Sequence, residues 1–385
     1  MTPFIFNTTP SIHFGAGQAA HLSDILHQRA LTRVLIVTDP GMIATGLVDD
    51  LLAPLATGPL KVAVFDQVLS DPPEHVVIQA VNTAKNHRAE AIIGFGGGSS
   101  LDVAKLVALL ADSDEKLADI YGVGLARGPR LPLIQIPTTS GTGSEVTPVA
   151  IVTTGTSEKM GVVSPLLLPD VALLDAALTL GLPAPITAAT GIDAMVHAIE
   201  AYASLNPNNN PLSRSLAREA LRLMGRSLET AVHSPADIAA RSDMLLGSMF
   251  AGQAFANSPV AAVHALAYPI GGHFKVPHGL SNALVLPHVL RFNAETAPTP
   301  YAQIAAIAFP ALAGNEGREA ATGFADALAD LAHRCGLQPR LRDVNIPRDA
   351  LAMLARDAMH QTRLLVNNPR PITEADALAI YTAAW

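Results

Sequence analysis

The chain has 385 residues, of which 49% are hydrophobic and 15% are charged, and its formal net charge is −8. This length and composition suit a compact globular protein with two domains and argue against intrinsic disorder. The negative charge and the lack of a Lys/Arg run argue against nucleic acid or an anionic membrane as partner, so we expect small-molecule partners.

Short β-branched runs alternate with helical stretches between about residues 30 and 180. The runs are residues 34–39, 61–66, 91–97 and 131–139. This alternation predicts an N-terminal α/β domain with a largely parallel sheet.

The composition changes beyond Gly181, where long Ala/Leu-rich segments such as residues 213–233 and 237–256 appear. These segments predict a C-terminal domain that is all helical. Pro183 and Pro185 disfavour helix just before them and mark the junction. The predicted domains are therefore residues 1–182 and 183–385.

A glycine run follows the third β-branched run. Gly96, Gly97 and Gly98 come directly before a helix that we expect to begin near Ser99. Glycines let backbone N–H groups approach a ligand, and a helix N-terminus adds partial positive charge, so this loop suits a pyrophosphate. The alternative is a tight turn in which Ser99 caps the helix and Asp102 completes the cap. We favour phosphate binding because that alternative leaves the glycines unexplained, although the loop does not meet the G-x-G-x-x-G fingerprint.

Two further features suit a nucleotide. Residues 136–148 place hydroxyls and glycines directly after a strand, where the carboxyl edge of an open α/β sheet collects ligands. A Ser/Thr-rich surface loop is the equal alternative. Asp39 is placed like an acid that binds a ribose 2′-OH, which favours NAD over NADP. An ordinary strand-ending turn is the alternative for Asp39, and without context it is the better supported one.

The helical half contains a candidate metal set. Asp193 and His197 are four residues apart, which on a helix places both side chains on one face. His264 opens a helical segment, and a chain reversal could return His278 toward it. One carboxylate and three imidazoles suit Zn²⁺ or Fe²⁺ better than Mg²⁺ or Ca²⁺. The alternative is a chance grouping of structural histidines.

The segment between the last two histidines carries helix-breaking residues. We expect its helix to break at Tyr268-Pro269 and again at Gly271-Gly272, because proline lacks an N–H and glycine is a poor helix former. These breaks would supply the chain reversal.

Four segments together resemble the iron-containing (group III) alcohol dehydrogenases of the dehydroquinate synthase-like superfamily. They are GGGSSLD (96–102), IPTTSGTGSEVT (136–147), GIDAMVHAIEAY (191–202) and HALAYPIGGHFKVPHG (264–279). The resemblance covers nearly the whole chain. It implies an α/β dinucleotide-binding domain, a helical metal and substrate domain, a deep cleft between them and a homodimer. It also implies a metal-dependent NAD(H) oxidoreductase that interconverts a small alcohol and its aldehyde or ketone by hydride transfer.

The resemblance further implies individual roles. The metal, with Fe²⁺ favoured and Zn²⁺ open, would be bound by Asp193, His197, His264 and His278. The nucleotide would be contacted by Asp39, Gly97, Gly98, Ser99, Thr138, Thr139, Thr147 and Lys159. Asp102 would support the glycine loop, and Phe255 would line the substrate side.

One position departs from the family. Many members carry a further histidine four residues after the position of His264, and here Tyr268 occupies it. Tyrosine, with a pKa of about 10, is a poorer proton carrier than histidine at neutral pH. The candidates for a proton route are therefore Tyr268 and His273.

Other activities are weighed against this one. A hydroxyacid–oxoacid transhydrogenase or related reductase on the same scaffold would retain its nucleotide between turnovers. A cyclising synthase of the dehydroquinate synthase type would need several cations around the metal, and the ligand-bearing segments offer only Lys275. A non-catalytic metal- or nucleotide-binding scaffold would bind both ligands without net NAD reduction.

The expected location is the cytoplasm. A single cysteine, Cys335, cannot form an intramolecular disulfide. The N-terminal segment lacks the pattern of a signal peptide, and no apolar run reaches the roughly 18 residues of a spanning helix.

Overall fold

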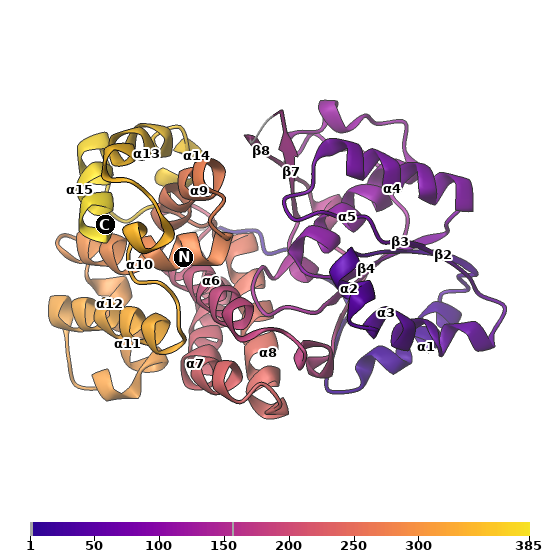
Figure 1. The fold of residues 1–385 in the computed structure, drawn as a ribbon, viewed down its shortest axis with the longest axis horizontal. Helices are drawn as coiled ribbons and strands as arrows, with labels where there is room; N and C mark the ends of the chain where they lie inside the picture. The colour runs from indigo at the N-terminus through magenta and orange to yellow at the C-terminus, as the bar shows by residue number, and fades with distance from the viewer. Residues whose placement is uncertain (1–2, 156–157) are drawn as a thin grey trace. The chain divides into compact units, whose positions relative to one another are not determined.

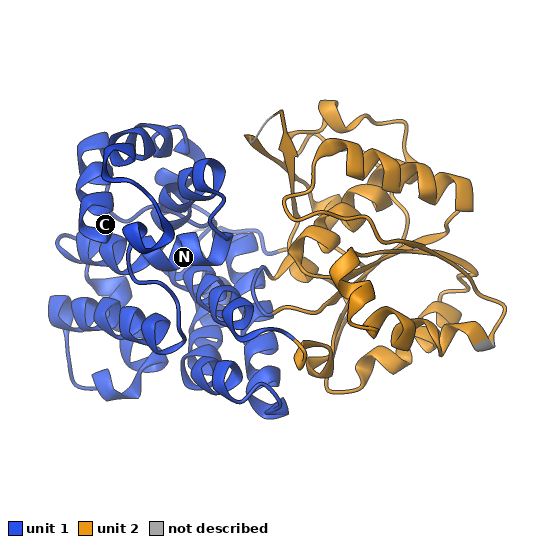
Figure 2. Ribbon diagram, in the orientation of Figure 1, with its two compact units in different colours: residues 1–6, 140–142, 182–385 blue, residues 7–139, 143–181 orange. Residues whose placement is uncertain are grey.

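The computed structural model describes residues 3–155 and 158–385. The chain divides into two compact units, a sheet unit and a helical unit, which are coloured orange and blue in Figure 2. The sheet unit comprises residues 7–139 and 143–181. The helical unit comprises the residues up to Phe6, residues 140–142 and residues 182–385. In the part of the chain that the structure describes, no helix is long and apolar enough to cross a membrane.

A six-stranded parallel sheet is the framework of the sheet unit, with the spatial order β1-β9-β6-β4-β2-β3. Its strands are β1 (Ile12–Phe14), β2 (Arg33–Val37), β3 (Lys61–Phe65), β4 (Ala91–Gly96), β6 (Leu133–Pro137) and β9 (Val171–Leu174). The four β-branched runs of the sequence are β2, β3, β4 and β6, which confirms the predicted α/β class. The short strands β1 and β9 were not predicted, because three and four residues are too few to show a pattern.

Helices cover both faces of this sheet (Figure 1). They are α1 (Leu22–Gln28), α2 (Pro40–Ala44), α3 (Leu47–Leu52), α4 (Glu74–His87) and α5 (Gly98–Asp112). On β2, Leu35 and Val37 join the apolar cluster of α4 and α5, whereas Val34 and Ile36 join that of α1 to α3. Successive side chains of a strand point to opposite faces, and a sheet buried on both faces needs apolar residues at every position.

A small sheet belongs to the same unit, with the order β5-β8-β7. Its strands are β5 (Gly122–Val123), β7 (Val149–Thr154) and β8 (Glu158–Val163). β7 and β8 are antiparallel, and their buried residues Ala150, Val152 and Val162 pack in the same apolar cluster as α5.

The helical unit is built from ten helices of the described chain. They are α6 (Ala184–Ala203), α7 (Pro211–His233), α8 (Ile238–Asn257), α9 (Ala262–Phe274), α10 (His278–Ala294), α11 (Thr299–Ala308), α12 (Gly317–Arg334), α13 (Leu351–Ala358), α14 (Thr362–Leu365) and α15 (Glu374–Ala384). This arrangement confirms the predicted all-helical C-terminal half.

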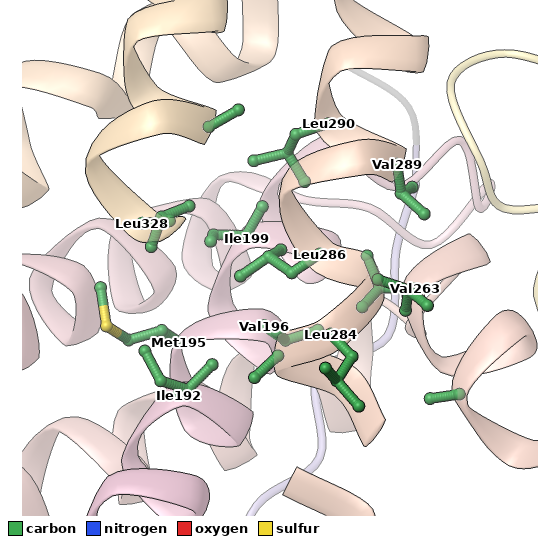
Figure 3. Packing of buried hydrophobic residues seen from close by; sticks show 14 of the residues in the cluster. Ile192, Met195, Val196, Ile199, Val263, Leu284, Leu286, Val289, Leu290 and Leu328 are labelled. Atoms are coloured by element: carbon green, nitrogen blue, oxygen red, sulfur yellow. The ribbon is translucent and has the colours of Figure 1, made fainter. Parts of the chain in front are cut away.

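The helix α6 lies in the core of the helical unit. Every residue from 191 to 203 is buried, and α6 contacts α7, α8 and α10. Figure 3 shows Ile199 of α6 in one apolar cluster with Leu286 of α10 and Leu328 of α12. A helix that is surrounded by apolar neighbours belongs to a core, so any polar side chain on it needs a partner.

The helix α9 runs without interruption through Pro269, Gly271 and Gly272, so the predicted breaks are wrong. Pro269 lacks the N–H that would bond the carbonyl of Ala265, four residues earlier. The hydroxyl of Tyr381 donates to the adjacent carbonyl of Leu266 at 2.6 Å. Packing against α10, α13 and α14 outweighs the weak helix propensity of these residues. The helix ends at Lys275, which has a left-handed φ of 57°, and α10 begins three residues later.

We expect Gly225→Ala to destabilise the protein, because a Cβ on Gly225 of α7 would lie 2.3 Å from the carbonyl oxygen of Ala308 on α11. Forcing these helices apart should lower the free energy of unfolding by about 1–3 kcal/mol. The matched control is Gly272→Ala inside α9, where a Cβ meets no atom within 4 Å. Thermal unfolding compares the two variants, and a Gly225→Ala protein as stable as the control would contradict the close packing.

Candidate metal centre and nucleotide site

Three side chains of the helical unit converge on one point. Asp193 on α6, His264 on α9 and His278 at the start of α10 each offer one ligand atom, and these atoms lie within 4.8 Å of one another. Nε2 of His264 lies 3.8 Å from Oδ1 of Asp193, and Nε2 of His278 lies 3.6 Å from the same oxygen. The chain reversal predicted from the sequence therefore exists, but it lies between α9 and α10 and not inside α9.

Glu200 orients one of these imidazoles and was not predicted from the sequence. Its Oε2 accepts the Nδ1–H of His264 at 2.7 Å, and its Oε1 accepts the N–H of Val263 at 2.6 Å. With the proton on Nδ1, Nε2 of His264 directs its lone pair toward Asp193. Glu200 follows Asp193 by two helical turns on the same face of α6, and this spacing is the signal that could have revealed it.

His197 lies beside the three converging side chains. Its Nδ1–H donates to the carbonyl of Gly141 at 3.3 Å, and its ring stacks on His264 and on Phe255 with centroid distances of 4.8 Å and 4.4 Å. The group whose ligand atoms lie within 4.8 Å of one another contains Asp193, His264 and His278 but not His197. Its role as a fourth ligand remains a prediction.

The surroundings set the charges of this cluster. Burial disfavours an ionised Asp193, but the neighbouring imidazoles and a hydrogen bond from Asn282 hold its pKa below the usual value. Burial lowers the pKa of His197 to about 3, so that this ring is neutral. Burial also opposes a charged His264, yet the hydrogen bond and the charge of Glu200 raise its pKa. A cation binds an ionised carboxylate and an unprotonated imidazole, so a metal ion at His264 competes with the proton that Glu200 favours.

The two candidates for proton transfer have different surroundings. The ring of Tyr268 lies 5.8 Å from that of His278 and edge-on to His264 at 6.4 Å. Burial raises the pKa of Tyr268 to about 12, which keeps its hydroxyl protonated. Nε2 of His273, in the last turn of α9, instead lies 2.6 Å from Oδ2 of Asp357 on α13.

In the sheet unit, the predicted nucleotide residues follow three neighbouring strands. Asp39 comes after β2, Gly97 after β4 and Thr138 after β6, and these strands are adjacent and parallel. The hydroxyl of Ser100 donates to Oδ2 of Asp39 at 3.0 Å, and the N–H of Thr138 donates to the carbonyl of Gly96 at 3.0 Å. The carboxyl edge of the sheet therefore brings these loops together.

The glycine loop has the open helix terminus that a phosphate site needs. Gly96 has a φ of 142°, which favours glycine, and a Cβ there would lie 3.0 Å from Oγ of Ser100. α5 begins at Gly98 after Gly97 and has no side-chain cap, so the capping alternative is wrong. Ser99 lies half-buried in the first turn of α5.

Asp102 and Lys105 fasten the second polar loop to α5. Asp102 accepts hydrogen bonds from the hydroxyl of Ser144 at 2.6 Å and from the N–H of Ile151 at 3.0 Å. The ammonium of Lys105, which is fully buried, donates to the hydroxyl of Thr147 at 3.1 Å and to the carbonyl of Val149 at 2.7 Å. Both polar loops of the predicted nucleotide site are therefore held by one helix.

The buried contacts around Lys105 involve charged groups that were not predicted from the sequence. Burial lowers the pKa of Lys105 to about 8 and raises that of the neighbouring Glu145 to about 7. Each group favours the charge of the other, which offsets part of the cost of burying both.

Two further predicted residues of the sheet unit have different surroundings. Thr139 lies beside the glycine loop, because a Cβ placed on Gly97 would be 3.6 Å from its side chain. Lys159 on β8 donates to the hydroxyl of Thr153 at 3.1 Å and forms an ion pair with Asp71.

Comparison with known proteins supplies the family. The family model for iron-containing alcohol dehydrogenase matches residues 9–176, and the model for the C-terminal part of the same family matches residues 187–385. A long-chain-alcohol dehydrogenase of Geobacillus thermodenitrificans is 42% identical over 383 residues, which cover 98% of this chain and 95% of the relative. The chain belongs to the iron-containing alcohol dehydrogenase family.

Solved structures resemble this member of the iron-containing alcohol dehydrogenases along its whole length. A 1,3-propanediol oxidoreductase superposes with a TM-score of 0.95 at 32% identity, and all of both chains is covered. A sulfoacetaldehyde reductase from Bifidobacterium kashiwanohense, solved in complex with NAD⁺, superposes with a TM-score of 0.89 at 31% identity and covers 100% of this chain and 99% of its own.

The residues of this iron-containing alcohol dehydrogenase fit a divalent transition metal. One carboxylate oxygen and imidazole nitrogens form a mixed donor set that suits Fe²⁺ or Zn²⁺. A metal-binding histidine usually donates its second N–H to a carboxylate, and Glu200 accepts that hydrogen bond from His264. The donor set and its orientation agree with the family.

We expect Glu200→Gln to weaken metal binding roughly 10- to 100-fold, because removing a partner that orients a ligand has effects of this size. A neutral amide holds the Nδ1–H of His264 less strongly than a carboxylate. Competition with a chelator measures the dissociation constant. The control is Glu229→Gln, an exposed glutamate on α7 that pairs with Arg334, and equal losses in both variants would contradict an orienting role.

We expect Lys105→Met to lower the free energy of unfolding by about 3–5 kcal/mol, because it leaves buried acidic groups without their cation. Thermal or denaturant unfolding measures the change. The control is the exposed Lys116, whose replacement by Met should leave stability unchanged. A Lys105→Met protein as stable as the control would show that Asp102 and Glu145 do not depend on this ammonium.

Proposed function

We propose that this chain is an NAD(H)-dependent, metal-containing oxidoreductase that interconverts a small alcohol and its aldehyde or ketone by hydride transfer. The observation that supports this most strongly is the convergence of Asp193, His264 and His278, with Glu200 orienting one imidazole. The family and its alcohol- and aldehyde-converting relatives point to the same reaction class.

The proposed metal ligands are Asp193, His197, His264 and His278. A divalent cation there would supply Lewis acidity toward a substrate oxygen, while NAD would carry the hydride. The family name favours Fe²⁺, and the donor set accepts Zn²⁺ equally well. Burial keeps His197 neutral, and Phe255 stacks on it, so this side of the site is apolar. We assign Phe255 to the substrate side for that reason.

The nucleotide is proposed to bind at the carboxyl edge of the parallel sheet. The uncapped N-terminus of α5 and its glycines suit the pyrophosphate. Asp39 is proposed to accept hydrogen bonds from the adenosine ribose and to repel a 2′-phosphate, which favours NAD over NADP. The remaining proposed contacts are Ser99, Thr138, Thr139, Thr147 and Lys159. The NAD⁺ complex of the sulfoacetaldehyde reductase supports the choice of cofactor.

Tyr268 is the better-placed candidate for hydrogen bonding to the substrate. Its ring contacts His264 and His278, and its hydroxyl stays protonated because its pKa is raised to about 12. His273 is the second candidate, and it is paired with Asp357 at the end of α9.

The proposal includes the domain organisation, the oligomeric state and the location of the protein. Residues 1–182 would form the dinucleotide-binding domain and residues 183–385 the metal and substrate domain. We also propose a homodimer, from the family resemblance, and a cytoplasmic location, from the family resemblance and the single cysteine.

The test is NADH formation by metal-stripped protein reloaded separately with Fe²⁺ or Zn²⁺, on primary alcohols, diols and hydroxy acids, with NADP⁺ in parallel. We expect metal-dependent reduction of NAD⁺, and we expect His264→Ala to lower it by more than about 100-fold while NAD binding is retained. His233→Ala is the control, because this exposed histidine lies on α7 and bonds the carbonyl of Arg334.

Two results would contradict this function. Full activity of a metal-free His264→Ala protein would exclude the metal centre from the reaction. If no substrate of the panel gave NADH, although the protein bound NAD measurably, the transhydrogenase or the synthase would be favoured.

A further inference from the structure

Asn282 is a buried amide among the three converging ligand atoms. It lies on α10 four residues after His278, so both side chains share one face of the helix. The residue is fully buried. Its Nδ2 lies 2.5 Å from Oδ1 of Asp193, and 3.3 Å from Nε2 of both His264 and His278.

The hydrogen-bonding capacity of these groups decides how the amide is held. A carboxylate oxygen only accepts, and Nε2 of His264 accepts because its Nδ1–H is donated to Glu200. A side-chain amide has two N–H donors, so it cannot bond fully to three acceptors, and its shortest contact is with Asp193. The charged acceptor therefore receives the strongest bond.

The carbonyl oxygen of the same amide does not determine its orientation. Among the residues that the structure describes, Oδ1 of Asn282 is buried and has no hydrogen-bond partner. A buried acceptor without a partner is unfavourable, so an amide that is free to choose would turn this oxygen toward a donor. The contact of Nδ2 with Asp193 outweighs that cost.

We propose that Asn282 is a positioning residue of the metal centre, which holds Asp193 so that Oδ1 faces the two imidazoles. This inference rests on the proposed metal centre. A carboxylate can rotate about its last bond, and Nδ2 of Asn282 lies closer to Oδ1 of Asp193 than Nε2 of either imidazole does. Because the amide is neutral, it orients the carboxylate without adding a second negative charge to the ligand set.

The matched control lies on the same helix. Asn293 is also a buried amide of α10, but it bonds the hydroxyl of Tyr301 and the side chain of Asn368. Asn293→Ala therefore removes a buried amide of α10 without touching the ligands.

The experiment compares Asn282→Ala, Asn282→Asp and Asn293→Ala in the full chain. Competition with a chelator measures the dissociation constants of Zn²⁺ and Co²⁺ in the absence of nucleotide and substrate. The visible absorption of bound Co²⁺ reports its coordination geometry, and NAD binding reports the integrity of the fold.

We expect Asn282→Ala to weaken metal binding roughly 10- to 100-fold and to change the Co²⁺ spectrum, while NAD binding is unchanged. Asn282→Asp keeps the shape but loses both N–H donors, so its Co²⁺ spectrum should also differ from that of the wild type. Asn293→Ala should retain wild-type affinity and spectrum.

Three results would overturn the assignment. One is wild-type affinity and spectrum in Asn282→Ala, and another is a wild-type spectrum in Asn282→Asp, since donation by the amide would then be irrelevant. The third is an equal loss in Asn293→Ala, which would indicate general destabilisation of α10. A wild-type protein that binds neither cation would instead refute the proposed metal centre itself, and this inference with it.

Discussion

The buried hydrogen bond between Glu200 and His264 is the interaction on which the proposed metal centre depends. α6 is enclosed by apolar neighbours, yet it carries Asp193, His197 and Glu200. Ionised groups in such a core are tolerated only when other groups pair with them. Glu200 meets that requirement by accepting a hydrogen bond from Nδ1 of His264 on α9, and this bond leaves Nε2 of the imidazole to bind a metal ion. The hydrogen bond that stabilises the buried Glu200 is therefore the same one that orients a proposed metal ligand.

The sheet unit meets a similar demand in another way. Its polar loops come after three neighbouring parallel strands, so the sheet alone brings their ends to one edge. The loops are then fastened by buried side chains of α5, with Asp102 bonding Ser144 and Lys105 bonding Thr147. A loop that is held in this way needs little rearrangement to bind a ligand, which reduces the entropy cost of binding.

Local patterns predicted the elements well and their interruptions poorly. Continuous β-branched runs identified β2, β3, β4 and β6, because a sheet buried on both faces leaves such runs in the sequence. Pro269 suggested a break in α9, but packing against α10, α13 and α14 stabilises the continuous helix. Asp102 was a plausible capping residue by spacing, whereas its partners come from a distant loop, at Ser144, and from β7, at Ile151. Contacts between distant segments leave no local pattern from which they could be predicted.

The sequence by itself determined the α/β and helical halves and the placement of Asp193 and His197 on one helical face, because these follow from spacing along the chain. It also determined the family, through the resemblance of its motifs. Only the tertiary structure decided which buried polar groups become partners. Glu200, Asn282 and Lys105 act on residues of other segments, and a hydrogen bond between segments depends on how the helices and loops pack. The physical reason is that periodicity records which side of an element is buried, whereas the partner of a buried polar group is set by the neighbouring element.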